Sequence, residues 1–197
     1  TFSFTTADLT KPSSTISTPS NGSIMGNAVT YTIKGTALDT GSGVSKVEVS
    51  INGGPWNAAT GTTSWTYAWM LSSDGTYTIK TRATDVAGNI ETVAAGITVT
   101  VDNAAPQTTA TPATGIYLTA QSVVLSSDET SVIYYTTDGT DPTTASSKYT
   151  SSILVNKNTT LKFFAIDAAG NIETPITTEV YTLDVTSPTT AASVAGG

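Results

Sequence analysis

The sequence predicts an all-β protein built from two tandem β-sandwiches, and three observations carry this prediction. Roughly a fifth of the 197 residues are Thr, and β-branched residues favour pleated, half-buried strands. Short apolar segments alternate with turn residues at a spacing of about 8 to 12 positions, and no segment keeps a helical period over three turns. One stretch of sequence also recurs at a fixed distance, which divides the chain into two related halves.

The repeat is clearest in residues 83–92, ATDVAGNIET, which return as AIDAAGNIET in residues 165–174. A second signature, an Asp followed by three residues and a Pro, occurs at Asp8, Asp102 and Asp184. A Pro at each junction restricts the backbone, so the short linkers should be semi-rigid.

These signatures set the expected domain boundaries. We expect the end strand and linker of a preceding unit over residues 1–11, one sandwich over 12–105, a second over 106–187, and the start of a following unit over 188–197. Because the chain opens at Thr1 without an initiator Met or a signal peptide, we expect it to be a processed product or a piece of something longer.

Apolar residues at alternate positions predict the individual strands. In the first sandwich they mark strands near residues 29–33, 44–51, 65–69, 77–81 and 97–101. In the second they mark strands near residues 123–125, 132–135, 153–155, 161–166 and 180–183. The Asn-Gly-Gly sequence at 52–54 and the Ser-Ser-Asp-Gly sequence at 72–75 predict tight turns between strands of the first sandwich.

Composition excludes several classes of function. The chain has no His and no Cys, which removes Ser-His-Asp and Cys-His catalysis, Cys/His zinc sites and disulfides. A formal net charge of −7 argues against nucleic acid or an anionic membrane as a partner. The sequence contains no run of 18 apolar residues, so no membrane-spanning segment is predicted. Low charge with many small polar residues is typical of an exported protein, so we expect an extracellular or cell-surface location.

Two groups of motifs resemble known families. Residues 43–54, 74–79 and 83–89 resemble bacterial immunoglobulin-like (Ig-like) domains, as found in repetitive bacterial surface proteins. Residues 133–143, IYYTTDGTDPT, and 161–171 resemble the chitobiase/β-hexosaminidase C-terminal domain, a small Ig-like module. Both resemblances imply Ig-like β-sandwiches that act as non-catalytic accessory domains, so an enzyme is not expected.

Four aspartates are candidate calcium ligands, although no cofactor is required. Asp85 and Asp167 precede an Ala-Gly-Asn loop, and Asp138 and Asp141 share a Pro-containing turn. Carboxylates and loop carbonyls suit Ca²⁺. The alternative, which we favour, is that each Asp caps its own loop through backbone N–H groups, with Gly88 and Gly170 supplying a positive φ.

Aromatic residues are candidate sugar-stacking groups. Trp65, Tyr67 and Trp69 alternate along one predicted strand, where burial in the core is the favoured interpretation. Trp56 follows a Gly-Gly-Pro turn, and together with Tyr134 and Tyr135 it is the candidate for contact with a carbohydrate.

The function that the sequence favours is that of a structural or adhesive extracellular module, whose partners are neighbouring Ig-like domains of the same or another chain. One alternative is a carbohydrate-binding accessory of a secreted glycoside hydrolase, with polysaccharide as the partner. Another is a filament subunit, in which the apolar face of Phe2 and Phe4 completes the sheet of a second copy.

Overall fold

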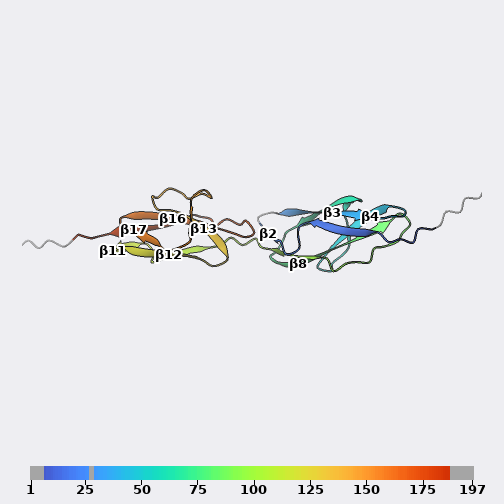
Figure 1. Cartoon of the computed structure of the whole chain (residues 1–197). Coiled ribbons are helices and arrows are strands. Elements are labelled where there is room, and N and C mark those ends of the chain that lie inside the picture. The colour runs from blue at the N-terminus through green and yellow to red at the C-terminus, as the bar shows by residue number, and fades with distance from the viewer. Residues whose placement is uncertain (1–6, 27–28, 187–197) are drawn as a thin grey trace, which may run out of the picture. The chain divides into compact units, whose positions relative to one another are not determined.

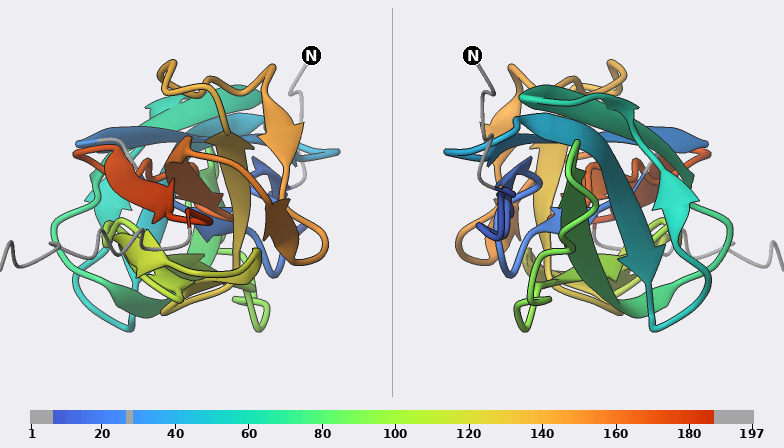
Figure 2. Two further views of the ribbon diagram at one scale, coloured as in Figure 1. Left: turned by 90° about the vertical axis from the view of Figure 1, so that its left-hand side faces the viewer. Right: turned by 90° about the vertical axis from the view of Figure 1, so that its right-hand side faces the viewer.

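The computed structural model describes residues 7–26 and 29–186, and all regular elements in these ranges are β-strands. The chain divides into two compact units, Thr1–Ala104 and Ala105–Gly197. Within each unit, two sheets pack face to face and their inner side chains form one core (Figure 1 and Figure 2). The predicted fold class, all-β with two Ig-like sandwiches, is confirmed. Among the described residues, none forms a helix long and apolar enough to cross a membrane.

The first unit contains a four-stranded and a five-stranded sheet. The four-stranded sheet has the order β1 (Ser13–Thr18), β3 (Thr30–Leu38), β7 (Ser64–Met70) and β6 (Thr60–Gly61). The five-stranded sheet has the order β2 (Ile24–Met25), β9 (Ile97–Val101), β8 (Gly75–Asp85), β4 (Val44–Ile51) and β5 (Asn57–Ala58). All neighbours are antiparallel except β2 and β9, which pair in parallel.

Alternation along the strands builds the core of this unit. On β4 the side chains of Val47 and Val49 are fully buried, whereas Lys46 and Glu48 face outward. Trp65 on β7 is 1% exposed and packs between the two sheets with Ile33. Burial of such large apolar surfaces is the main favourable term in folding.

The second unit is a smaller sandwich. Its three-stranded sheet has the order β10 (Thr108–Thr111), β12 (Gln121–Ser127) and β15 (Ile153–Val155). Its five-stranded sheet has the order β11 (Gly115–Tyr117), β17 (Thr177–Leu183), β16 (Thr159–Asp167), β13 (Ser131–Thr136) and β14 (Ser147–Lys148). Leu161, Phe163 and Tyr181 are at most 1% exposed and face Val123 and Val155 of the opposite sheet.

Some sequence expectations differ from the structure or lie outside it. Val29, expected on the inner side of a strand, is 76% exposed and precedes β3. The expected end strand within residues 1–11 and the following unit at 188–197 lie outside the described residues, apart from 7–11, which form no strand. Phe2 and Phe4, named for the filament hypothesis, also lie outside the described residues.

Candidate functional site

The two repeated Asp-x-Ala-Gly-Asn loops are closed by their own aspartates. The carboxylate of Asp85, at the end of β8, accepts hydrogen bonds from the backbone N–H and the side-chain amide of Asn89, both at 2.7 Å. Asp167, at the end of β16, accepts the same two bonds from Asn171 at 2.8 Å. Gly88 and Gly170 have φ of 94° and 89°, a conformation that glycine adopts without strain. These are the contacts that the loop-capping interpretation requires.

A glutamate at the end of each repeated loop joins the two sheets of its unit. The carboxylate of Glu91 accepts from the backbone N–H groups of Ser14 on β1 and Ala83 on β8, both at 2.8 Å, and from the Ser14 hydroxyl. Charge-assisted bonds of this kind are about twice as strong as neutral ones. We call this set of contacts the glutamate clamp. It ties the first strand of the sandwich to the opposite sheet.

The second unit repeats the glutamate clamp with Glu173, which is 7% exposed. Its carboxylate accepts from the backbone N–H of Thr108 on β10 and of Ala165 on β16, both at 2.9 Å, and from the Thr108 hydroxyl. Sequence reasoning missed both glutamates. The signal was present, because Glu stands six positions after Asp in both copies of the repeat.

The segment that enters the first unit is held by two loops. The Asp8 carboxylate accepts from the backbone N–H of Ser42 at 2.7 Å, and the Asp8 carbonyl accepts from the side-chain amide of Asn89 at 3.0 Å. Hydrogen bonds from Thr10 and then from Ser42 hold the pKa of Asp8 well below its usual value. Asp8, which precedes the first strand, is therefore part of the folded unit.

Asp85 has two acidic neighbours that the sequence did not reveal. One carboxylate oxygen from each of Asp8, Asp39 and Asp85 lies within 4.8 Å of the other two. Carboxylates at such spacing are a donor set that Ca²⁺ accepts. An acidic cluster alone does not define a metal site, and calcium at Asp85 and at Asp167 remains a prediction.

The other two calcium candidates each have a separate partner. Asp138 accepts from the hydroxyl and the backbone N–H of Thr140, at 2.6 and 3.0 Å, and these bonds lower its pKa. Asp141 forms an ion pair of 2.6 Å with Lys162. Both arrangements stabilise the turn without a metal, and calcium at this turn remains a prediction as well.

The aromatic residues divide into core and surface groups. Trp65 and Trp69 are 1% and 8% exposed, and Tyr67 packs against the same core, as the favoured interpretation requires. Trp56 is half-buried, and the guanidinium carbon of Arg82 lies 4.4 Å from its ring centroid. Trp56 is therefore the sugar-stacking candidate of the first unit with exposed ring surface.

Of the two tyrosine candidates, Tyr134 presents little surface to a ligand. Tyr134 is 9% exposed, its ring stacks on Phe164 with centroids 5.5 Å apart, and Lys148 lies 5.7 Å from the ring. Tyr135 is half-buried and packs against the core of the second unit.

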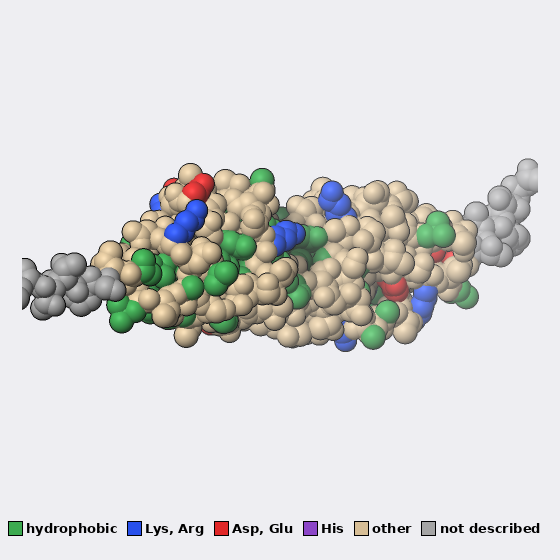
Figure 3. Space-filling model, turned by 60° about the vertical axis from the view of Figure 1, so that its left-hand side comes forward, with side chains coloured by type: hydrophobic (Ala, Val, Ile, Leu, Met, Phe, Trp, Pro, Cys, Tyr) green, Lys and Arg blue, Asp and Glu red, His purple; other side chains and the backbone are tan. Residues whose placement is uncertain are grey.

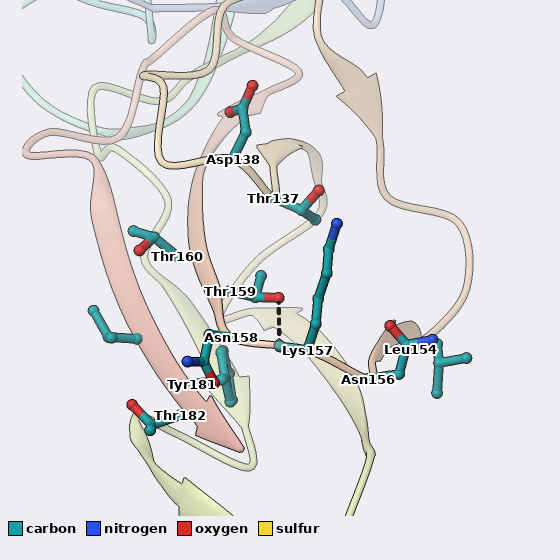
Figure 4. Close-up of a pocket in the computed structure, with 11 residues that line it drawn as sticks. Thr137, Asp138, Leu154, Asn156, Lys157, Asn158, Thr159, Thr160, Tyr181 and Thr182 are labelled. Carbon is teal, nitrogen blue, oxygen red and sulfur yellow. Dashed lines mark hydrogen bonds between the residues drawn. The ribbon is translucent and has the colours of Figure 1, made fainter. Parts of the chain in front are cut away.

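A polar cavity of about 470 Å³ lies in the second unit, between the turn before β16 and the loop after β13. Figure 4 shows the side chain of Lys157 extending toward Thr137, with Asn158 and Thr182 nearby. Tyr181 forms part of the wall; its hydroxyl donates to the Pro112 carbonyl at 2.7 Å, and burial raises its pKa to about 12. The lining offers both donors and acceptors, which suits a ligand rich in hydroxyl groups.

Charged side chains are sparse on the surface that the structure describes, as one face of it illustrates. Figure 3 shows one face of the molecule, on which acidic and basic side chains are few and neutral groups predominate. This agrees with a composition in which only 12% of the residues are charged.

Comparison with family models identifies both units. Residues 12–81 match the model of the Bacterial Ig domain, and residues 112–178 match that of the Chitobiase/beta-hexosaminidase C-terminal domain. The chain therefore carries a bacterial Ig domain followed by a chitobiase/β-hexosaminidase C-terminal domain, in the order that the sequence motifs predicted. Domains of these kinds are typically non-catalytic accessory modules.

Two solved structures are similar in part. The fibronectin(III)-like modules of Clostridium thermocellum CbhA are 17% identical, with 87% of this chain and 94% of that chain covered and a TM-score of 0.49. A putative membrane anchored protein from Corynebacterium diphtheriae is 13% identical, with 86% of this chain and 53% of that chain covered and a TM-score of 0.28. The comparison with curated proteins gave no match.

Proposed function

We propose that this chain is a non-catalytic spacer in a surface or secreted bacterial protein, where its tandem Ig-like sandwiches separate or display other parts. One observation carries the proposal: both units tie their first strand to the opposite sheet through the same glutamate clamp, Glu91 in one and Glu173 in the other. A spacer needs entry strands that resist being peeled away, and charge-assisted bonds to backbone N–H groups supply that resistance.

The test is forced unfolding of the two-unit chain, pulled from its ends in a single-molecule experiment. Tension on the entering segment loads β1, so Ser14→Ala, which removes a hydroxyl donor to Glu91, is expected to lower the unfolding force of the first unit. Ser17→Ala is the matched control on the same strand, because its exposed hydroxyl donates to the Lys34 carbonyl at 3.2 Å and not to Glu91. Equal unfolding forces for the two variants would contradict the role given to the clamp.

Carbohydrate binding is a second candidate, and the polar cavity of the second unit favours it. The lining of Lys157, Asn158, Thr182 and Asp138 offers donors and acceptors around a space of about 470 Å³, a size at which ligand pockets occur. The test is retention of the two-unit chain on chitin, cellulose or peptidoglycan. Retention that is lost in Lys157→Ala would support this function, and no retention on any of the three would remove it.

A further inference from the structure

The outer face of the five-stranded sheet in the first unit gathers basic side chains. Lys46 on β4 and Lys80 and Arg82 on β8 all point away from the core, because they alternate with buried residues. They represent three of the eight Lys and Arg residues in a chain whose formal net charge is −7. Glu48 is the acidic residue that lies among them, directly opposite Arg82 in the strand register. We call Lys46, Glu48, Trp56, Lys80 and Arg82 the basic face.

Trp56 lies at the edge of this face. The residues that follow it form β5, which pairs Asn57 with Val49 and Ala58 with Glu48. The guanidinium carbon of Arg82 lies 4.4 Å from the centroid of the Trp56 ring. Contact between a guanidinium and an indole face is a favourable cation–π arrangement.

Glu48 fixes the orientation of Arg82. Its carboxylate accepts from Arg82 Nε at 2.9 Å and lies 3.2 Å from Lys46 Nζ. Burial raises the pKa of Glu48, but the bonds from Arg82 and Lys46 outweigh this effect and lower it overall. Among the described residues none accepts a hydrogen bond from the two terminal nitrogens of Arg82, so both stay available to a ligand.

We propose that the basic face binds an anionic polysaccharide, through a carboxylate or sulfate group on the sugar. The planar guanidinium donates two parallel hydrogen bonds to such a group, and the ring and Glu48 hold it in place before the ligand arrives. Lys80 and Lys46 add positive charge on either side. The exposed surface of Trp56 packs against the apolar face of a neighbouring sugar ring.

The observations favour an anionic over a neutral saccharide. Arg82 already occupies one face of the Trp56 ring, so that face cannot stack on a sugar. Three basic side chains against one carboxylate leave the face positive, whereas the whole chain is negative. An anionic polymer should therefore contact only the basic face, because the remaining surface, which is net negative, repels it.

Calorimetry with the full chain tests the proposal at low ionic strength, using polygalacturonate, dextran sulfate and neutral dextran of matched length. Binding to at least one polyanion and none to dextran is the expected result, and the comparison of the two polyanions identifies the preferred group. The Arg82→Lys variant keeps the charge but loses the planar fork, so its affinity should fall about tenfold. Lys80→Gln should weaken binding, whereas Lys34→Gln, the same change on the exposed side of β3, should not.

Four results would overturn the proposal. Dextran bound as tightly as the polyanions would mean that charge plays no part. Equal affinities for the parent chain and the Arg82→Lys variant, or equal losses in Lys80→Gln and Lys34→Gln, would mean that this face does not bind the polymer. Single-stranded DNA bound as tightly as both polysaccharides would mean that the face recognises polyanions in general rather than sugars.

Discussion

At the scale of single residues, the contribution of a carboxylate to stability depends on whether it is buried or exposed. The buried carboxylate of Glu173 accepts from two backbone N–H groups and from the hydroxyls of Thr108 and Thr177, so its oxygens find their hydrogen-bond partners inside the protein. The exposed carboxylate of Asp141 pairs with Lys162, where solvent screens the interaction. Stability should therefore depend on the first group far more than on the second.

Adjacent threonines on β10 allow a direct test. Thr108→Val removes the buried hydroxyl donor to Glu173 and should lower the free energy of unfolding by about 1 to 2 kcal/mol. Thr109→Val removes an exposed hydroxyl that bonds to Ser126 and should change it by less than about 0.5 kcal/mol. Urea titrations followed by far-UV circular dichroism measure both values. A larger loss for Thr109→Val would contradict the role of the clamp.

The entering segment should make the first unit sensitive to acid. The folded pKa of Asp8 lies below its usual value, so its stabilising contribution is present above an unfolded pKa of about 4 and is lost as the pH falls toward the folded value. Asp8→Asn should therefore lower the melting temperature at pH 7, and the difference from the parent chain should shrink below about pH 4. Thermal unfolding followed by tryptophan fluorescence, with a chelator present, measures this difference in melting temperature. A difference that stays constant with pH would refute the role given to the Asp8 carboxylate.

At the scale of elements, the close approach of three strands depends on one glycine. Gly35 on β3 pairs with Ile16 on β1 and with Trp65 on β7. A Cβ atom at this position would lie 2.1 Å from the Thr15 carbonyl oxygen and 2.2 Å from the Trp65 ring. The large side chain of Trp65 fits under the sheet because position 35 has no side chain.

Gly35→Ala should consequently destabilise the first unit by about 2 to 4 kcal/mol, since backbone and indole would have to move apart. Thr32→Ala, at an exposed position of the same strand, serves as the control and should cost less than about 1 kcal/mol. Urea unfolding followed by tryptophan fluorescence separates the two. Equal midpoints would show that the strands have room for a methyl group.

The same elements show how far sequence patterns can predict this fold. Long strands such as β4 and β8 were predicted because at least three alternating positions reveal a buried face. The two-residue strands β5 and β14 carry no period that could be recognised. The strand β1 was missed because Ile16 is its one apolar residue, and its attachment comes from Glu91 instead.

In the candidate sites, contacts between residues close in sequence could be predicted, whereas contacts between residues far apart in sequence could not. The cap between Asp85 and Asn89 was predicted because its partners are four positions apart. The bond between Ser14 and Glu91 spans 77 positions, and no local pattern reveals such a contact before the sheets are paired. The placement of Arg82 over Trp56 likewise depends on the register of β4, β5 and β8.

At the scale of the whole molecule, each unit has its own core and its own set of sheets. All three Trp residues belong to the first unit, so tryptophan fluorescence reports on that unit alone, whereas far-UV circular dichroism reports on both. The two signals together can show whether the units unfold independently.

Phe163→Ala tests this independence. Phe163 is fully buried in the second core, and its truncation should cost about 3 to 5 kcal/mol there. The dichroism transition should shift to lower urea while the fluorescence midpoint stays unchanged. A fluorescence midpoint that falls with it would show that the first unit depends on the second for its stability.

The hydrogen bond from the Asn89 side chain to the Asp8 carbonyl determines where the N-terminal boundary of this module should be placed in a chimeric protein. A boundary drawn at the proline keeps every strand of the sandwich, yet it discards the acceptor for Asn89 and the carboxylate that the Ser42 N–H requires. Anyone who transplants the first module into a chimera should begin it before Asp8. The complete module is then the sandwich together with the last few residues that precede it. Recombination at Pro12 would yield a domain that lacks two of its native hydrogen-bond partners.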